Sequence, residues 1–174
     1  MKQFLLFTLI LPFFATAQLT KKDSLWLPLS GLIGDWKGSG EGVDGAGTYE
    51  RSYKFTLNKN YIEIKNKTTY PANEKTKTGY LHEDIGYISY DKMRKTFIFR
   101  QFHIEGFINQ YRLESISSDK KTLTFVSESI ENIPTGWRAK EVLMISNNEL
   151  TEVFYLAEPG KEYEQYTKAN LVRK

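Results

Sequence analysis

Apolar side chains recur at every second position along most of this chain, and this period limits the folds that are open to it. A period of two is typical of β-strands with one buried face, whereas a helix repeats every 3.6 residues. Clusters of glycine, proline, asparagine and aspartate separate these segments roughly every ten to fourteen residues, as turns do. The segments expected to be strands are residues 48–57, 61–70, 79–90, 95–104, 107–116, 123–130, 137–145, 150–157 and 163–172.

Consecutive strands joined by short turns lie antiparallel, and closing the sheet on itself removes the two edges that invite aggregation. We therefore expect an all-β fold, a single antiparallel up-and-down β-barrel of about ten strands. A glycine-rich segment after Gly34 supplies the first strand, and residues 24–32 form a short N-terminal helix. A two-sheet sandwich is the alternative fold. Barrels of this size often enclose a ligand, so we expect any binding site in the interior.

The first 17 residues have the pattern of a secretory signal peptide, with Lys2 before an apolar run that ends in Ala15-Thr16-Ala17. The run is shorter than the ~20 apolar residues of a comfortable membrane span. We expect cleavage before Gln18 and export through a Sec-type pathway to the periplasm or the exterior. Residues 18–174 are then one ligand-binding barrel domain without a membrane span, and its oligomeric state is left open.

Charge and cysteine content exclude several classes of function. The net charge is +3, but lysines and arginines alternate with acidic residues and do not form the basic patch that nucleic-acid binding requires. The chain has no cysteine, and so no disulfide, thiolate nucleophile or thiolate metal site. Its two histidines lack the short local spacing of a zinc signature.

Seven of the twelve glycines fall within residues 31–47, and residues 40–45 match the phosphate-binding pattern G-x-G-x-x-G. A dinucleotide loop opens a helix after that pattern, but strand-like residues follow here. Glu41 and Asp44 would also repel a phosphate. We therefore interpret the glycines as a bent first strand, with Trp36 as an apolar plug at one end of the barrel.

Four runs of sequence carry a resemblance to a known family. The chain resembles nitrobindin-type haem-binding β-barrels, of the wider lipocalin and fatty-acid-binding group, in its opening LSGLIGDWKGSGEG and GAGTYERSYKF, its strand TGYLHEDIGYI and its last strand YEQYTKANLVR. The third of these runs matches the family pattern H-x-E-x-G-[FY]-[IL] through His82, Gly86 and Tyr87, with Asp84 in place of Glu. The resemblance implies a calycin-type barrel with haem as the cofactor.

The family's closing strand carries the histidine that ligates haem iron, and the resemblance places Tyr166 at that position. Tyrosinate is a known axial ligand of haem. A phenol with a pKa of about 10 needs a positive partner in order to ionise. The candidates for this partner are Arg51, Arg100, Arg112 and Arg138. The alternative is a barrel-lining tyrosine that is hydrogen-bonded to a neighbour or a small ligand.

Further residues are expected at the ligand site. His82 shares a strand face with Asp84, so the carboxylate orients a base or metal ligand, or the two form a polar pair at the rim. His103 ends a strand beside aromatic residues and is the second candidate for holding iron, with a satisfied, partly buried histidine as the alternative. In fatty-acid-binding barrels, arginine and tyrosine in the cavity grip a carboxylate. Here the large side chains assigned to the ligand site are Arg138, Tyr111, Tyr155 and Trp36, with a rim or outward position as the alternative for Arg138.

The sequence supports three functions of different class. The first is an exported barrel that binds a hydrophobic or amphipathic small molecule, with haem as the ligand that the resemblance names. The second is an enzyme, because nitrobindin-like barrels are linked to peroxynitrite isomerisation at ferric haem. That activity requires iron in the pocket, and no catalytic residue is assigned. The third is a structural or partner-binding envelope protein whose barrel is filled by its own side chains.

Overall fold

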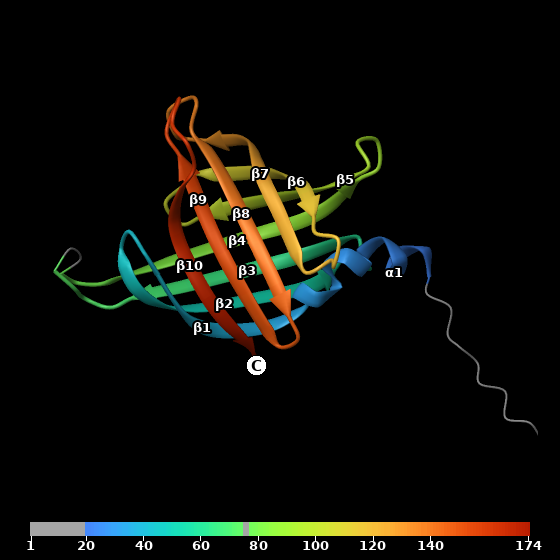
Figure 1. Cartoon of the computed structure of the whole chain (residues 1–174), viewed down its shortest axis with the longest axis horizontal. Helices are drawn as coiled ribbons and strands as arrows, with labels where there is room; N and C mark the ends of the chain where they lie inside the picture. The colour runs from blue at the N-terminus through green and yellow to red at the C-terminus, as the bar shows by residue number, and fades with distance from the viewer. Residues whose placement is uncertain (1–19, 75–76) are drawn as a thin grey trace, which may run out of the picture.

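The computed structural model describes residues 20–74 and 77–174, so the predicted signal peptide lies outside the described residues. The described part begins with a helix, α1 (Lys21–Trp26), which continues as a 3₁₀ helix, η1 (Leu27–Leu32). Strands make up most of the remainder, as Figure 1 shows. They are β1 (Gly34–Gly42), β2 (Gly45–Thr56), β3 (Tyr61–Tyr70), β4 (Tyr80–Asp91), β5 (Thr96–His103), β6 (Ile108–Ile116), β7 (Thr122–Glu131), β8 (Arg138–Ser146), β9 (Glu149–Ala157) and β10 (Glu164–Arg173).

The strands close into one antiparallel barrel, in which each strand pairs with its neighbours in sequence and β1 also pairs with β10. The closing seam runs from Trp36 opposite Arg173 to Gly42 opposite Thr167. Closure pairs both edges of the sheet, which confirms the predicted barrel over the sandwich. Most strand boundaries agree closely with the predicted segments, and the exception is β2, which starts at Gly45 inside the glycine run.

The glycine run forms the β1–β2 hairpin, and its backbone lies unusually close to β10. A Cβ atom added at Gly38 or Gly40 would lie under 3.0 Å from backbone atoms of that strand, for example 2.8 Å from the Cα of Leu171 in the case of Gly38. Gly45 has a positive φ of 97°, which favours glycine. The G-x-G-x-x-G pattern therefore provides a tight seam and a turn, and a strand follows it in place of a helix.

The N-terminal helices and two tryptophans close one end of the barrel. Trp26 packs edge-on against Phe55, with 5.8 Å between ring centroids, and its Nε1 donates to the carbonyl oxygen of Lys59 at 2.8 Å. Trp36 is fully buried, and its Nε1 donates to the carbonyl oxygen of Leu32 at 2.8 Å. Trp36 is thus part of an apolar plug, as expected, but it shares this role with Trp26.

The helical segment begins earlier than the predicted residues 24–32. The side-chain oxygen of Thr20 accepts a hydrogen bond from the backbone N–H of Asp23 at 3.1 Å, and this cap lets α1 start at Lys21. Neither α1 nor any other helix among the described residues is long and apolar enough to cross a membrane.

The interior changes character from one end of the barrel to the other. Around the helices it is an apolar core, which includes Trp26, Leu29 and Trp36. Toward the other end it becomes a cavity that reaches the loops carrying Asp44 and Glu105. The closed end thus supplies packing energy, whereas the opposite end offers space and polar groups.

Candidate functional site

The cavity inside the barrel has a volume of about 520 Å³. Alternate residues of each barrel strand point inward, so the lining gathers side chains from strands that are distant in sequence. The apolar lining comes mainly from β7 to β9 and consists of Phe99, Phe107, Ile130, Ile133, Leu143, Phe154 and Leu156. The ionisable and amide lining comes mainly from β2 to β6 and includes Arg51, Asn66, His82, Asp84, Gln101, His103 and Asn109.

A buried ion pair forms part of the wall. The Nη2 atom of Arg51 lies 2.6 Å from Oε1 of Glu152, and Nε lies 3.0 Å from both carboxylate oxygens. The Nη1 atom of the same guanidinium donates to Oγ1 of Thr68 at 3.2 Å. Buried charges must be paired and hydrogen-bonded to be tolerated, and this pair meets that condition within the protein. The positive charge of Arg51 is therefore already balanced.

Glu141 is a second buried glutamate, on the neighbouring strand β8. It is 8% exposed, and it has no hydrogen-bond or ion-pair partner within residues 20–74 and 77–174. Burial, followed by the negative charge of Glu152, raises the pKa of Glu141 well above 4.5. Its carboxyl group therefore favours the protonated form inside the barrel.

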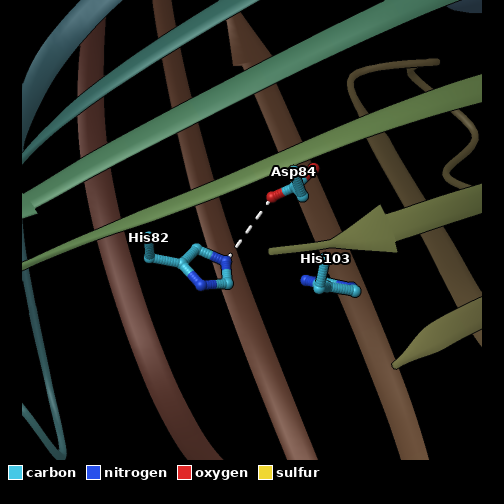
Figure 2. Close-up of side chains that lie close together, drawn as sticks. All are labelled: His82, Asp84 and His103. Carbon is cyan, nitrogen blue, oxygen red and sulfur yellow. Dashed lines mark ion pairs between the residues drawn. The ribbon is translucent and has the colours of Figure 1, made fainter. Parts of the chain in front are cut away.

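Three side chains from β4 and β5 lie close together, as Figure 2 shows. His82 and Asp84 share the inner face of β4, and Asp84 pairs in register with His103 at the end of β5. One nitrogen of each histidine and one oxygen of Asp84 lie within 4.8 Å of one another, and Nε2 of His82 is 3.6 Å from Oδ2 of Asp84. We call His82, Asp84 and His103 the strand-end triad.

Each member of the triad is held in place by a residue that does not belong to the triad. Nδ1 of His82 lies 2.7 Å from a carboxylate oxygen of Glu105. Asn66 donates from Nδ2 to Oδ1 of Asp84 at 2.9 Å. Nε2 of His103 lies 3.2 Å from Nδ2 of Asn109, and its ring stacks on Phe107 with 4.1 Å between centroids. These contacts fix the orientation of the two rings and the carboxylate.

The two imidazoles of the triad have opposite acid–base properties. Burial disfavours a charge on His82, but the neighbouring carboxylates of Asp84 and Glu105 outweigh that effect and raise the pKa. Burial lowers the pKa of His103 to about 4, so this ring is neutral at neutral pH. Nδ1 of His103 is buried and has no hydrogen-bond partner among the described residues.

Tyr166 lines the same cavity from β10. The register of β10 against β9 shifts between Gln165 and Thr167, so Tyr166 sits in a bulge whose side chain lines the cavity. Its ring packs edge-on against Phe154 at 5.8 Å between centroids. Burial, followed by the negative charges of Asp44 and Glu105, raises the pKa of the Tyr166 phenol. A phenol in these surroundings remains protonated.

Three of the residues assigned to the ligand site from sequence line the cavity, namely His82, His103 and Tyr166. Tyr111 is fully buried inside the barrel, where its hydroxyl accepts a hydrogen bond from Asn109 at 2.7 Å, but it does not reach the cavity surface.

Arg138, Tyr155 and Trp36 do not line the cavity, contrary to the prediction. On β8 and β9 the inward positions are those of Glu141 and Glu152, so Arg138 and Tyr155 fall on the outer face. There Arg138 hydrogen-bonds the carbonyl oxygen of Lys161. The Nζ atom of Lys140 lies 4.3 Å from the ring centroid of Tyr155 on the same face. Trp36 belongs to the plug at the closed end.

Sequence reasoning missed the buried glutamates and the residues that support the triad. Glu141 alternates with Ala139 and Leu143, and Glu152 alternates with Leu150 and Phe154, so both occupy the apolar phase of their strands. An ionisable residue at an apolar position of the alternation indicates a charge inside the barrel. The sequence alone could therefore have predicted that both glutamates point inward. Asn66, Glu105 and Asn109 had no comparable signal, because their partners come from other strands or turns.

Comparisons with known proteins agree with this geometry. The family model described as THAP4-like, heme-binding beta-barrel domain matches residues 26–173. Fourteen chains of solved structures match, and one is the crystal structure of Rv2717c from M. tuberculosis. That chain is 17% identical, with a TM-score of 0.61, and the match covers 86% of this chain and 97% of that chain. This likeness shows the fold alone. No curated protein matches the sequence.

Proposed function

Because the chain belongs to the family of THAP4-like, haem-binding β-barrel domains, we propose that its cavity binds a small amphipathic molecule. The observation that carries the proposal is the cavity of about 520 Å³, with apolar side chains mainly from β7 to β9 and ionisable ones mainly from β2 to β6. Ligand sites are typically concave and largely apolar, with a few converging polar groups. The cavity also weakens the alternative of a structural protein, which rested on a filled barrel.

Haem is the ligand that the family names, and His103 is the residue of this chain that suits its iron. The ring is neutral at neutral pH, lines the cavity and carries a buried nitrogen without a partner among the described residues. A neutral imidazole is a common axial ligand of haem. When bound, haem would supply a redox-active iron, which is the premise of the peroxynitrite isomerase alternative.

Tyr166 suits the iron less well, although it stands where the family's histidine is expected. A tyrosinate ligand needs a positive partner, and the surroundings of Tyr166 instead disfavour its ionised form. None of the four arginines named from the sequence is free to act as that positive partner. Arg51 is paired with Glu152, whereas Arg100, Arg112 and Arg138 are hydrogen-bonded at or near the surface.

A titration with hemin, followed by visible spectroscopy, tests this proposal. We expect a saturable Soret band at one equivalent for the unaltered protein and for Tyr166→Phe, and loss of that band in His103→Ala. Tyr155→Phe on the outer face is the matched control for an aromatic change. Weak absorbance that does not saturate would exclude haem. Native mass spectrometry of the purified protein would then decide between another co-purified small molecule and no ligand at all.

Export is the second part of the proposal, and it rests on the signal-peptide pattern of the first 17 residues. The expected result is a protein recovered from the envelope or the medium whose first residue is Gln18. Intact-mass measurement and N-terminal sequencing check this directly. A product that still carries Met1 and stays with the cytoplasmic fraction would contradict export without affecting the binding proposal.

A further inference from the structure

We propose that the strand-end triad is a binding site for a first-row divalent metal ion, such as Zn²⁺ or Fe²⁺, that is held by the protein alone without a porphyrin. His82 and His103 would supply imidazole nitrogens, and Asp84 a carboxylate oxygen. The inference does not rest on the proposed small-molecule function, because all three ligands and their supports belong to this chain.

The spacing of the ligand atoms is close to what such an ion requires. Metal–ligand bonds of about 2.1 Å in tetrahedral or octahedral geometry place neighbouring ligand atoms roughly 3.0 to 3.4 Å apart. The distance from Nε2 of His82 to Oδ2 of Asp84 is 3.6 Å, and all three candidate atoms lie within 4.8 Å of one another. The 3.6 Å gap is longer than an ordinary hydrogen bond. Small side-chain rotations would shorten these separations to the values that a bound ion requires.

The polar contacts around the triad match those that normally support metal ligands. A metal-bound histidine usually donates its other ring N–H to a carboxylate or carbonyl group, and ligating carboxylates are themselves hydrogen-bonded. Glu105 at 2.7 Å from Nδ1 of His82 directs Nε2 of that ring toward Asp84. Asn66 binds Oδ1 of Asp84 and leaves Oδ2 available. Asp84 is only 5% exposed, so water cannot easily replace these partners.

Two unsatisfied atoms beside His103 point to the same conclusion. Nδ1 of His103 and Oδ1 of Asn109 are both buried without a partner among the described residues, although Nδ2 of Asn109 lies 3.2 Å from Nε2 of the ring. Turning the carboxamide by 180° exchanges its nitrogen and oxygen. Nε2–H of His103 would then donate to Oδ1 of Asn109, and Nδ1 would present a lone pair to an ion. This rotation would give Oδ1 of Asn109 a donor, and a bound ion would give Nδ1 of His103 its partner.

The kind of ion follows from the ligands. Two imidazoles and one carboxylate suit zinc and iron, whereas calcium and magnesium prefer oxygen ligands throughout. Three protein ligands leave at least one coordination position for water or a substrate. Since the triad lines the cavity, that position would face the enclosed space and any molecule bound there.

Titration of metal-stripped protein with Co²⁺, followed by visible spectroscopy, tests the site without haem. We expect one equivalent of Co²⁺ to produce d–d absorption bands, and Zn²⁺ to displace it in calorimetry. His82→Ala and His103→Ala should each abolish saturable binding. Glu105→Gln and Asn109→Leu should weaken it by roughly tenfold to a hundredfold, as loss of supporting contacts does in other metal sites.

Glu83→Gln is the matched control, because Glu83 lies between His82 and Asp84 on β4 but is exposed on the outer face. Circular dichroism and thermal unfolding establish that each variant is folded. Absence of stoichiometric Co²⁺ binding in the unaltered protein, or binding that persists in both histidine variants, would overturn the proposal. In either case the triad is a polar cluster only. Because hemin is absent from this titration, its result is separate from that of the haem experiment.

Discussion

At the scale of single residues, the charged groups inside the barrel differ in whether an opposite charge balances them. Arg51 has an opposing carboxylate at 2.6 Å, whereas Glu141 faces the cavity without a partner among the described residues. Desolvation disfavours an isolated charge, so the two side chains are expected to affect stability in different ways. Each difference can be measured by substituting one residue.

Glu141→Gln should stabilise the protein above pH 4.5 and have little effect below it. The pKa of Glu141 is raised well above 4.5 in the folded state. As the pH rises past 4.5, the unfolded chain loses this proton while the folded protein retains it. The unaltered protein therefore loses about 1.4 kcal/mol of stability per pH unit until the folded pKa is reached. Glutamine lacks this loss, so the gap between the two proteins should widen with pH. Urea unfolding from pH 4 to pH 8 measures it, and a gap independent of pH would contradict the assignment.

Arg51→Met should lower the free energy of unfolding by about 3 to 5 kcal/mol, because it leaves the charge of Glu152 buried and unpaired. Replacing both residues, as in Arg51→Met with Glu152→Leu, should restore much of the loss. The control is Lys54→Met, which removes an exposed ion pair of 3.2 Å with Asp35 that solvent screens. Urea unfolding at neutral pH compares the variants. Equal effects of Arg51→Met and Lys54→Met would show that burial of the pair is unimportant.

At the scale of elements, the seam between β1 and β10 is where the barrel closes. The two strands approach so closely that a Cβ atom at Gly38 would overlap the carbonyl oxygen of Asn170 and lie 2.8 Å from the Cα of Leu171. Both obstacles are backbone atoms, so the strand itself would have to move. The glycines of β1 are thus a condition for closure and not a ligand motif.

Gly38→Ala should therefore destabilise the barrel by roughly 2 to 3 kcal/mol or more, through overpacking at the seam. Ser39→Ala is the matched control, since Ser39 is the next residue of β1 and is exposed. Urea unfolding gives the difference, and hydrogen exchange should show faster exchange in β1 and β10 than elsewhere. A loss that is equal in the two variants would mean that β1 tolerates a side chain at this position.

The strands and the barrel could be predicted from sequence because their signal is local. A period of two and regular turns specify antiparallel neighbours, and the need to remove edges specifies closure. The pairing of His82 and Asp84 was also predictable, since the two residues share a face of one strand.

The rest of the site depends on how strands align with one another. His103 meets Asp84 through the register of β4 and β5, and Asn109 reaches His103 from β6. Periodicity within one strand does not contain this information. Arg138 and Tyr155 were misplaced for a simpler reason, because the inward phase of β8 and β9 is occupied by Glu141 and Glu152. For the same reason, a metal site can form without the short local spacing of a zinc signature, because strand register can bring ligands from different strands together.

At the scale of the whole molecule, the barrel separates stability from binding along its axis. The apolar plug around Trp26 and Trp36 lies at the helix end, and the strand-end triad lies near the open end. Neither Trp26 nor Trp36 lines the cavity. Distant sites without shared partners usually contribute independently to stability. The two ends of this barrel are therefore expected to behave as separate units in a folded protein.

Trp26→Ala tests this separation. Removing the indole should cost about 3 to 5 kcal/mol of stability, because it leaves a void in the core and frees the carbonyl oxygen of Lys59. Zn²⁺ at about 100 times its dissociation constant should raise the free energy of unfolding by about 2.7 kcal/mol. This gain should be the same in the unaltered protein and in Trp26→Ala. Urea unfolding with and without Zn²⁺ gives all four values. A smaller metal-dependent gain in Trp26→Ala would show that the plug and the triad are coupled through the barrel wall, and the closed end would then contribute to binding as well as to stability.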